Sequence, residues 1–585
     1  MHARGRRVLA GSLACCVVLV SAAGWSAHLA LGVRDHLQAS RDALTHLRAV
    51  MSARDLDRIA VTLADAHRHA AEARRLTAGP DWSLLTHLPV VGDGATTVRG
   101  LAESAAEVTE VLTAVQRAGT SVLTTGGRAS DDARQVLDGL RAADPVLQEA
   151  AARITRARDR LVATPASTGV ASVDQARVTA LHLLDRLHGM VSGAATATAL
   201  IPPMLGADGP RRYFLAFQTN AEARGTGGLV GAFGILEAHH GKISITGLSA
   251  NTGIGRSPRP VTDHGPAFRA RYGPGAARLL SVSNLSPHFP YAAETWTGLW
   301  ERQHGRRLDG AIAIDPVGLS YLLGFTGPVT GPGRERVTAA NVVDLTERAA
   351  YARFPDPAER KRYLVGIARA VSGRLPGSMA DPAQVLPVLK PLIEERRLQV
   401  WSRRAAEQRR LAATALGGVL PRAPGPYAAL VVNNSAGGKL DYYLNRSVEY
   451  ALGPCKDGRR PTTVRIRLTN DVPRSDLPGY VTGRLDSPER AHRAGSNLLW
   501  VSLYAGAGAK LAAARIDDRQ VAVLREFERS HPVYSTLLEL APRQSRTMTF
   551  DLVEPASGAA PVVPVQPLAR PQRTSVTIAP GACAS

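Results

Sequence analysis

The sequence predicts an α+β multidomain protein with one transmembrane helix at its N-terminus. Three observations predict this class: an uncharged segment near the N-terminus, helical spacing of apolar residues up to about residue 200, and strand-like runs after it. A chain of 585 residues has room for roughly two to four domains. The expected parts are a cytoplasmic basic tail (1–7), a transmembrane anchor (8–33), an exported helical region (34–204), a central α/β domain (205–440) and a β-sandwich-like domain (441–585).

The N-terminal segment is interpreted as a signal-anchor. An arginine-rich stretch at 4–7 precedes Val8 to Val33, which contains no Asp, Glu, Lys or Arg. These 26 residues would form a helix longer than the hydrocarbon core of about 30 Å, and the arginines favour a cytoplasmic N-terminus. A cleaved signal peptide is the alternative, with small residues at Ala22-Ala23 and Ser26-Ala27. Both interpretations export the body of the chain, and the expected location is the cell membrane, single-pass and mostly extracytoplasmic.

The chain is strongly basic, with 71 Lys and Arg against 50 Asp and Glu and a formal net charge of +21. Only six of the basic residues are lysines, a bias typical of a GC-rich bacterial genome. A basic surface attracts polyanions such as nucleic acid, anionic lipid or phosphorylated wall polymer. Because the body is expected outside the cell, nucleic acid is not an expected partner.

Residues 34–204 are predicted to form amphipathic helices, because apolar residues recur at helical spacing, as at Leu44, Leu47 and Met51. Breaks such as Gly79-Pro80 and Gly126-Gly127 favour several antiparallel helices or an extended stalk. The region is either a partner-binding coiled coil or a spacer that holds the next domain away from the bilayer.

Strands interleaved with helices predict an α/β domain over 205–440. The expected first strands are 212–218 and 229–238, and the polar, Gly-rich stretch 219–228 between them is interpreted as a loop. Backbone amides there, together with Arg224, could meet a phosphate or carboxylate. Alternatively, the glycines only permit positive-φ turns and close strand approach.

From Leu440 onward, short alternating runs separated by turns predict a β-sandwich. Cys455 and Cys583 are the only cysteines in the exported part, since Cys15 and Cys16 lie in the apolar segment. Two exported cysteines allow one disulfide, which we expect between Cys455 and Cys583. No CxxC or HxxxH pattern indicates zinc, and no metal site is expected.

An ordered set of motifs runs through the chain: Trp82, Leu88-Pro89-Val90-Val91-Gly92, Tyr213-Phe214-Leu215, Asn220, Glu222, Arg224, Thr226-Gly227-Gly228, Asp315-Pro316, Gly327-Pro328-Val329 and Asn433–Tyr443. In order and spacing, these motifs resemble the bacterial envelope proteins of domain-of-unknown-function family 4012. The family has no established activity, so the resemblance implies a cell-envelope protein without naming a reaction.

The central domain also resembles the LytR-CpsA-Psr enzymes, which move lipid-diphosphate-linked glycopolymers onto peptidoglycan. The similar stretches are Asp309–Asp315, followed by Leu319, and Ala350–Arg353, followed by Arg360. In those enzymes arginines grip the diphosphate and carboxylates hold magnesium. Here no carboxylate follows Arg224 closely, so Mg²⁺ is expected only if the chain is a transferase.

The only acidic residue of the 219–228 stretch, Glu222, is either a metal ligand or a partner of Arg224. The leading functional hypothesis is a membrane-anchored envelope protein that binds an anionic glycopolymer or its lipid-linked precursor in cell-wall or polysaccharide assembly. The candidate ligand-binding residues are Arg224, Asn220, Arg353 and Arg360. The alternatives are a Mg-dependent phosphotransferase that attaches glycopolymer to peptidoglycan, and a structural scaffold without a ligand, so enzymatic activity stays open.

Overall fold

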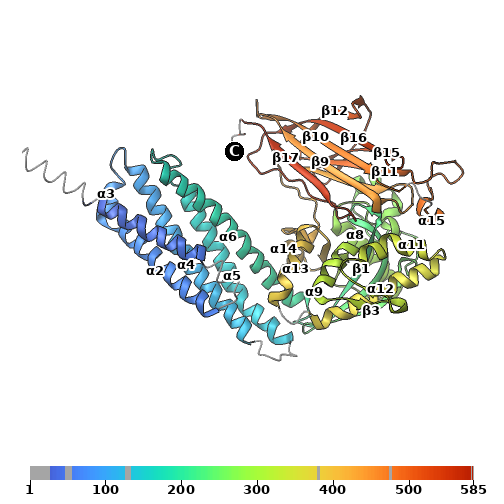
Figure 1. Ribbon diagram of the computed structural model, residues 1–585, viewed down its shortest axis with the longest axis horizontal. Helices are drawn as coiled ribbons and strands as arrows, with labels where there is room; N and C mark the ends of the chain where they lie inside the picture. The colour runs from blue at the N-terminus through green and yellow to red at the C-terminus, as the bar shows by residue number, and fades with distance from the viewer. Residues whose placement is uncertain are drawn as a thin grey trace, which may run out of the picture. The chain divides into compact units, whose positions relative to one another are not determined.

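The computed structural model (Figure 1) describes residues 25, 27–46, 56–125, 133–378, 382–473, 477–580 and 583. The chain divides into two compact units, residues 1–208 and 209–585. The predicted basic tail and most of the predicted anchor at 8–33 lie outside the described residues. The described end of that anchor, 27–33, belongs instead to a helix of the first unit, in which Val33 is buried with Ala73 and Trp82. In the part of the chain that is described, no helix combines the length and the apolar character needed to cross a membrane.

The first unit consists of long helices that lie side by side (Figure 1). They cover 27–46, α2 (Leu56–Ala78), the short α3 (Pro80–Leu85), α4 (Gly92–Thr125), α5 (Ala133–Val162) and α6 (Ala171–Met204). The apolar faces of α4, α5 and α6 meet in one core that contains Val108, Ile154 and Leu184, and a second core joins the first helix, α2, α3 and α4. The amphipathic spacing in the sequence therefore predicted the helical character of this region correctly.

A five-stranded mixed sheet forms the centre of the second unit, in the order β3-β2-β1-β4-β7. Its strands are β1 (Arg211–Arg224), β2 (Gly227–His239), β3 (Lys242–Ala250), β4 (Gly310–Ile314) and β7 (Leu398–Ser402). β1 runs parallel to β4, whereas the other neighbouring pairs are antiparallel.

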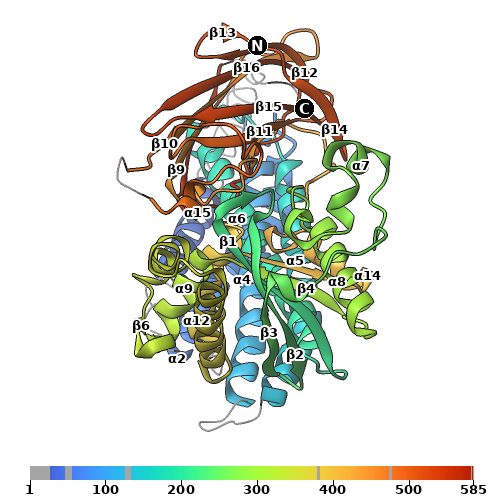
Figure 2. The same cartoon turned by 90° about the vertical axis from the view of Figure 1, so that its right-hand side faces the viewer.

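Successive side chains of β1 point to opposite sides of the sheet. Because those on both sides are apolar, helices cover both faces. Phe214 packs with Trp296 of α8 (Phe289–His304) on one face. Leu215 packs on the other face, in a core that also holds residues of α9 (Pro316–Thr326) and α12 (Pro357–Ser378). Figure 2 shows α8 and α12 on opposite sides of the sheet. The shorter elements are α7 (Pro266–Tyr272), β5 (Val329–Thr330), β6 (Arg336–Val337), α10 (Val342–Asp344), the π-helical turn η5 (Leu345–Ala349), α11 (Ala350–Arg353), α13 (Pro382–Glu394) and α14 (Ala405–Ala412).

The C-terminal strands form two sheets that enclose a common apolar core. The six-stranded sheet contains β13 (Arg519–Gln520), β12 (Lys510–Ile516), β16 (Ser545–Pro555), β10 (Arg459–Asn470), β9 (Leu444–Leu452) and β17 (Gln572–Ile578). The four-stranded sheet contains β14 (Leu524–Glu528), β15 (His531–Leu540), β11 (Asn497–Ala505) and β8 (Ala428–Asn434), and the short α15 (Gly479–Thr482) lies outside both sheets. Because β8 pairs with β11, this sandwich begins before the boundary at 440/441 that the sequence suggested.

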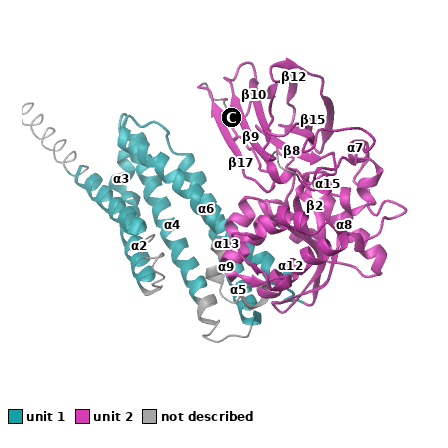
Figure 3. Ribbon diagram, turned by 45° about the vertical axis from the view of Figure 1, so that its right-hand side comes forward, with its two compact units in different colours: residues 1–208 teal, residues 209–585 magenta. Residues whose placement is uncertain are grey.

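The central sheet and the sandwich belong to one compact unit, which is magenta in Figure 3. Cys455 and Cys583 form a disulfide, with their Cα atoms 5.2 Å apart. This bond ties the end of the chain to the turn between β9 and β10.

Candidate functional site

The far end of β1 lies where the central sheet meets the sandwich. β1 pairs with β4 only as far as Phe217, but it continues to Arg224 with irregular register against β2. The polar side chains of this extension, among them Asn220, Glu222 and Arg224, are buried. Buried polar groups need hydrogen-bond partners, so this extension is held by side chains and backbone from the sandwich and its connections.

The stretch interpreted as a loop, 219–228, is therefore mostly strand, and only a tight connection at Gly225-Thr226 remains between β1 and β2. The glycines permit the close approach that this hairpin requires. A Cβ on Gly225 would clash with the backbone of Leu285, and one on Gly228 would clash with Thr219. The structural explanation of the glycines thus accounts for the motif without a bound phosphate.

Arg224 is one member of a buried ionic triad with Glu222 and Lys439. Its Nη2 donates to Glu222 Oε1 at 2.5 Å, its Nε donates to the carbonyl of Ser281 at 3.1 Å, and its Nη1 donates to the carbonyl of Ala223 at 2.8 Å. The Lys439 ammonium pairs with the other oxygen of Glu222. Burial alone would raise the pKa of Glu222, but the two cations hold it below the ordinary value. The donors of Arg224 are thus occupied by protein acceptors.

The other predicted site residues lie in different hydrogen-bond networks. Asn220 donates to the carbonyl of Pro567 at 3.0 Å. Arg353 is exposed and pairs with Glu335 at 2.9 Å. Arg360 is buried and donates to the carbonyl of Phe354 at 2.7 Å, while its guanidinium lies 3.9 Å from the centre of the Tyr480 ring. The Lys439 ammonium lies 5.3 Å from the centre of the same ring. Tyr480 therefore contacts both Arg360 and the Lys439 member of the triad.

The magnesium site implied by the LytR-CpsA-Psr resemblance does not fit these residues. Both oxygens of Glu222 are engaged by cationic side chains, which would compete with a metal ion for them. Among the described residues, no group of three or more His, Cys, Asp and Glu side chains is arranged to hold a metal ion. We therefore derive no reaction step through magnesium.

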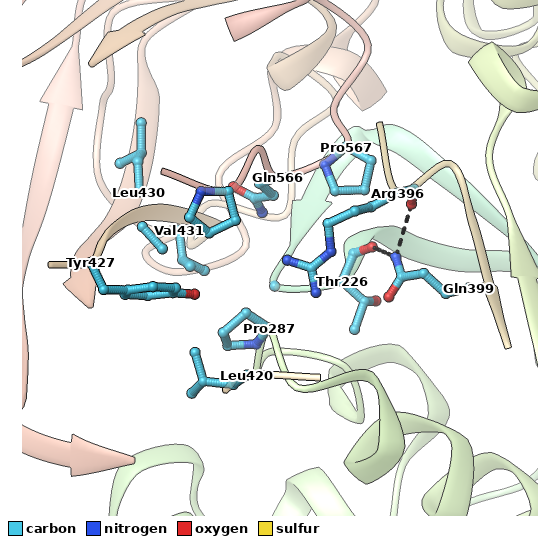
Figure 4. A pocket seen from close by; sticks show the side chains of 13 residues that line it. Thr226, Pro287, Arg396, Gln399, Leu420, Tyr427, Leu430, Val431, Gln566 and Pro567 are labelled. Carbon is cyan, nitrogen blue, oxygen red and sulfur yellow. Dashed lines mark hydrogen bonds between the residues drawn. The ribbon is translucent and has the colours of Figure 1, made fainter. Parts of the chain in front are cut away.

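A different arginine faces a cavity at the same junction (Figure 4). Arg396 follows α13 with a left-handed backbone, φ +57°, and its guanidinium points into the cavity between Tyr427, Thr226 and Pro287. Within the described residues, its side chain has no hydrogen bond or ion pair. Burial lowers the pKa of Arg396, an effect that the neighbouring Tyr427 partly offsets. The same burial raises the pKa of Tyr427 to about 12.

The walls of the cavity are largely apolar or amide-bearing. They consist of Gly225, Thr226, Pro287, Gln399, Leu420, Tyr427, Ala429, Leu430, Val431, Pro564, Gln566 and Pro567. Gln399 donates to the carbonyls of Thr226 at 2.7 Å and of Arg396 at 3.2 Å, and these bonds fix the backbone on both sides of the guanidinium. The enclosed space has room for little more than a water molecule, so only a small charged group can enter fully.

Hydrogen-bond donors exceed acceptors beside this cavity. His288 adjoins Pro287, and its Nδ1 faces the N–H of Leu420 at 3.1 Å while its Nε2 faces Arg529 Nη1 at 3.0 Å. A neutral imidazole accepts at only one nitrogen. Burial first, and then Arg529 and other cations including Arg396, lower the pKa of His288. Arg396 and Arg529 thus bring positive charge to this region, which favours an anion, while the carboxyl group of Glu528 also acts on Tyr427.

The sequence offered little sign of this arginine. Arg396 stands in the charged run Glu394-Glu395-Arg396-Arg397, a pattern typical of a solvated helix end. Its neighbour Arg397 is buried and pairs with Asp315 at 2.7 Å, so the two arginines have opposite roles. The left-handed backbone at Arg396 gives the two neighbouring arginines different surroundings, and the local sequence does not reveal it.

The fold and the site define a class of protein: a helical unit followed by a mixed α/β sheet joined to a β-sandwich, with a basic cavity at the junction. Residues 208–351 match the model of the family described as protein of unknown function (DUF4012), so this segment is similar to that family. The family prediction is confirmed.

No curated protein matches the sequence. A similar solved structure comes from Legionella pneumophila subsp. pneumophila str. Philadelphia 1 and is described as a "putative nutrient binding protein". It shares 9% identity at a TM-score of 0.15, and the alignment covers 23% of this chain and 44% of that chain. The chain thus spans under half the length of that structure, and a likeness at this level carries no functional argument.

Proposed function

We propose that the protein binds an anionic glycopolymer, or its lipid-linked precursor, in the cell envelope, and that the Arg396 cavity holds the anionic group. The observation that carries the proposal is the guanidinium of Arg396, which faces the cavity without a hydrogen bond or ion pair in the described part of the chain. A half-buried cation without a counter-charge loses part of its hydration, and a bound phosphate or carboxylate would compensate for that loss.

The cavity walls suit an anion that is attached to a less polar group. The planar fork of an arginine binds a phosphate or carboxylate with two parallel hydrogen bonds. Leu420, Tyr427 and the prolines around it offer apolar contact to the carbon atoms next to that group. Because the enclosed space holds about one water molecule, one oxygen atom of the charged group would enter and the rest of the group and the polymer would stay outside.

The proposal includes a location on the outer side of the cell membrane. It rests on the uncharged residues 8–24, which precede the first described helix, and on the arginines at 4–7. Extraction of cell membranes with alkaline carbonate tests this part separately, because a spanning segment keeps the protein in the pellet.

The binding test uses the full chain in detergent and a short poly(glycerol phosphate) as the probe, with a neutral glucan of similar length as the control ligand. Arg396→Ala should weaken binding by about 1.5–3 kcal/mol, which is about tenfold to a hundredfold in Kd. Arg353→Ala is the matched control, because Arg353 is exposed and already paired with Glu335.

Two results would contradict the proposal: wild-type affinity in Arg396→Ala, or equal affinity for the neutral glucan. A large effect of Arg353→Ala with none of Arg396→Ala would transfer the site to the α11–α12 corner. The phosphotransferase and scaffold alternatives stay predictions, and turnover of a prenyl diphosphate by the purified chain is the measurement for the first of them.

A further inference from the structure

We propose that one end of the helical unit lies against the surface of a lipid bilayer. This apolar end consists of the α3–α4 connection with its flanks (residues 84–91), the α5–α6 connection (162–170), and Trp25 and Leu31 of the first described helix. The proposal does not depend on the Arg396 cavity, which belongs to the other unit.

Large apolar side chains are exposed at this end and scarce elsewhere on the described part of the unit. Val90 is 93% exposed and Leu84 is 68% exposed. The exposed large apolar residues of this end are Trp25, Leu31, Leu84, Leu88, Val90, Val91, Val162 and Val170. Elsewhere in the described residues of the unit they are Val61, Val178 and Met190. Clusters of this kind mark contact surfaces for proteins or membranes.

The two connections also lack charged side chains. Neither 82–92 nor 161–173 contains an Asp, Glu, Lys or Arg, although charged residues border both stretches. One end of the unit thus lacks the charges that ordinarily keep loops in water, which favours a lipid surface.

The two connections are neighbours in space. Thr97 of α4 donates to the carbonyl of Pro165 at 3.2 Å, and a Cβ on Gly100 would lie 2.7 Å from Thr164. Their exposed valines therefore belong to one continuous surface, which lies at the α3 end of the helices in Figure 1.

The backbone holds these side chains outward. Trp82 is buried below the connection and donates to the carbonyl of Ala95 at 3.0 Å. The N–H of Gly92 donates to the carbonyl of Leu88 at 2.9 Å, which closes the turn. At its tip Val90 has a φ of +78°, a strained value for a β-branched residue. Strained backbone conformations of this kind cluster at functional sites, which favours a role for the exposed Val90 side chain.

Trp25 points to lipid as the occupant of this surface. Its indole N–H donates to Asp81 of α3 at 3.3 Å, so it stands beside the connection. In the sequence it directly follows the uncharged residues 8–24, which we expect within a membrane. Tryptophan is enriched at membrane interfaces, where its ring is apolar and its N–H is hydrated. A bilayer that receives 8–24 would therefore meet the apolar end directly.

The test measures the depth of two labelled positions in phosphatidylcholine vesicles. The full chain carries Cys15→Ser and Cys16→Ser, and then either Val90→Cys or Val61→Cys, each labelled with an environment-sensitive fluorophore. Val61 is the matched control, since it is also an exposed valine (70%) of the same unit. It lies about 25 Å further along α2 from the apolar end, at about 1.5 Å per residue.

Quenching by nitroxide-labelled lipid should be at least about fivefold stronger at position 90 than at 61, with the label at 90 about 5–10 Å deep in the interface. Quenching by aqueous iodide should show the opposite order. Strong iodide quenching and no lipid quenching at position 90 would overturn the proposal and would favour a protein partner. Equal lipid quenching at both positions, or failure of the chain to associate with vesicles, would overturn it as well.

Discussion

Replacing Glu347 by glutamine should remove a pH-dependent loss of stability. Glu347 lies in the π-helical turn η5 and is buried. Its Oε2 accepts hydrogen bonds from the N–H of Ala221 and, at 3.0 Å, from the hydroxyl of Thr219, whereas its Oε1 has no partner in the described part of the chain. Burial, together with the negative charge of Asp315, raises the pKa of Glu347 from 4.5 to about 8.

The direction of the effect follows from the two pKa values. Between about pH 4.5 and about pH 8, the unfolded chain loses this proton while the folded chain keeps it. The free energy of unfolding therefore falls as the pH rises through this interval, by at most about 1.4 kcal/mol per pH unit from this group. Glutamine keeps the acceptor for Ala221 and Thr219, places an amide at the position of Oε1, and cannot ionise.

Urea unfolding of the full chain at several pH values checks this expectation. Glu347→Gln should gain stability relative to the wild type as the pH rises from about 5 to about 8, and the difference should level off above that. Glu449→Gln, at an exposed position of β9, makes the same chemical change without burial and is the matched control. Parallel stability curves for the wild type and Glu347→Gln would refute the reasoning.

Two further predictions concern the second unit. Arg224→Ala should lower the free energy of unfolding by about 3 kcal/mol, because it breaks a buried ion pair. It should leave the binding of poly(glycerol phosphate) unchanged. Unaltered unfolding in urea, or lost binding, would contradict this prediction. Reduction of the Cys455–Cys583 disulfide, or Cys455→Ser, should lower the free energy of unfolding by up to about 5 kcal/mol in the chain-entropy model, because the bond spans 128 residue steps. Equal unfolding midpoints with and without reductant would contradict this prediction.

The regular patterns of the sequence predicted the elements but not the length of β1. Short apolar runs indicated the strands that contain Tyr213 and Leu229, and both are observed. Beyond Gln218, polar residues and glycines indicated a loop, because such residues are usually solvated. They are strand residues here because Lys439 and Pro567, which are remote in sequence, supply their partners. Local sequence contains no record of such distant partners.

The candidate site shows the same limit. Arg224, Asn220, Arg353 and Arg360 were selected by motif, and the structure gives each of them acceptors from the protein itself. The arginine that faces a cavity, Arg396, comes from a charged run in which the next residue is a buried ion-pair partner of Asp315. A left-handed backbone at one position separates the two roles, and the side-chain types do not reveal it.

Comparing the Arg224 and Arg396 variants distinguishes an arginine that stabilises the fold from one that binds a ligand. A cation that is fully satisfied by the protein contributes to folding, and its removal leaves a buried carboxylate with one partner fewer. A half-buried cation without a partner loses part of its hydration in the folded state, so its removal should leave stability unchanged or raise it. The scaffold hypothesis does not explain why the folded chain keeps such an unpaired cation. If Arg396→Ala is at least as stable as the wild type but binds the anionic probe more weakly, then Arg396 serves to bind a ligand. If Arg396→Ala is clearly less stable and binds equally well, Arg396 belongs to the fold and the ligand hypothesis loses its physical basis.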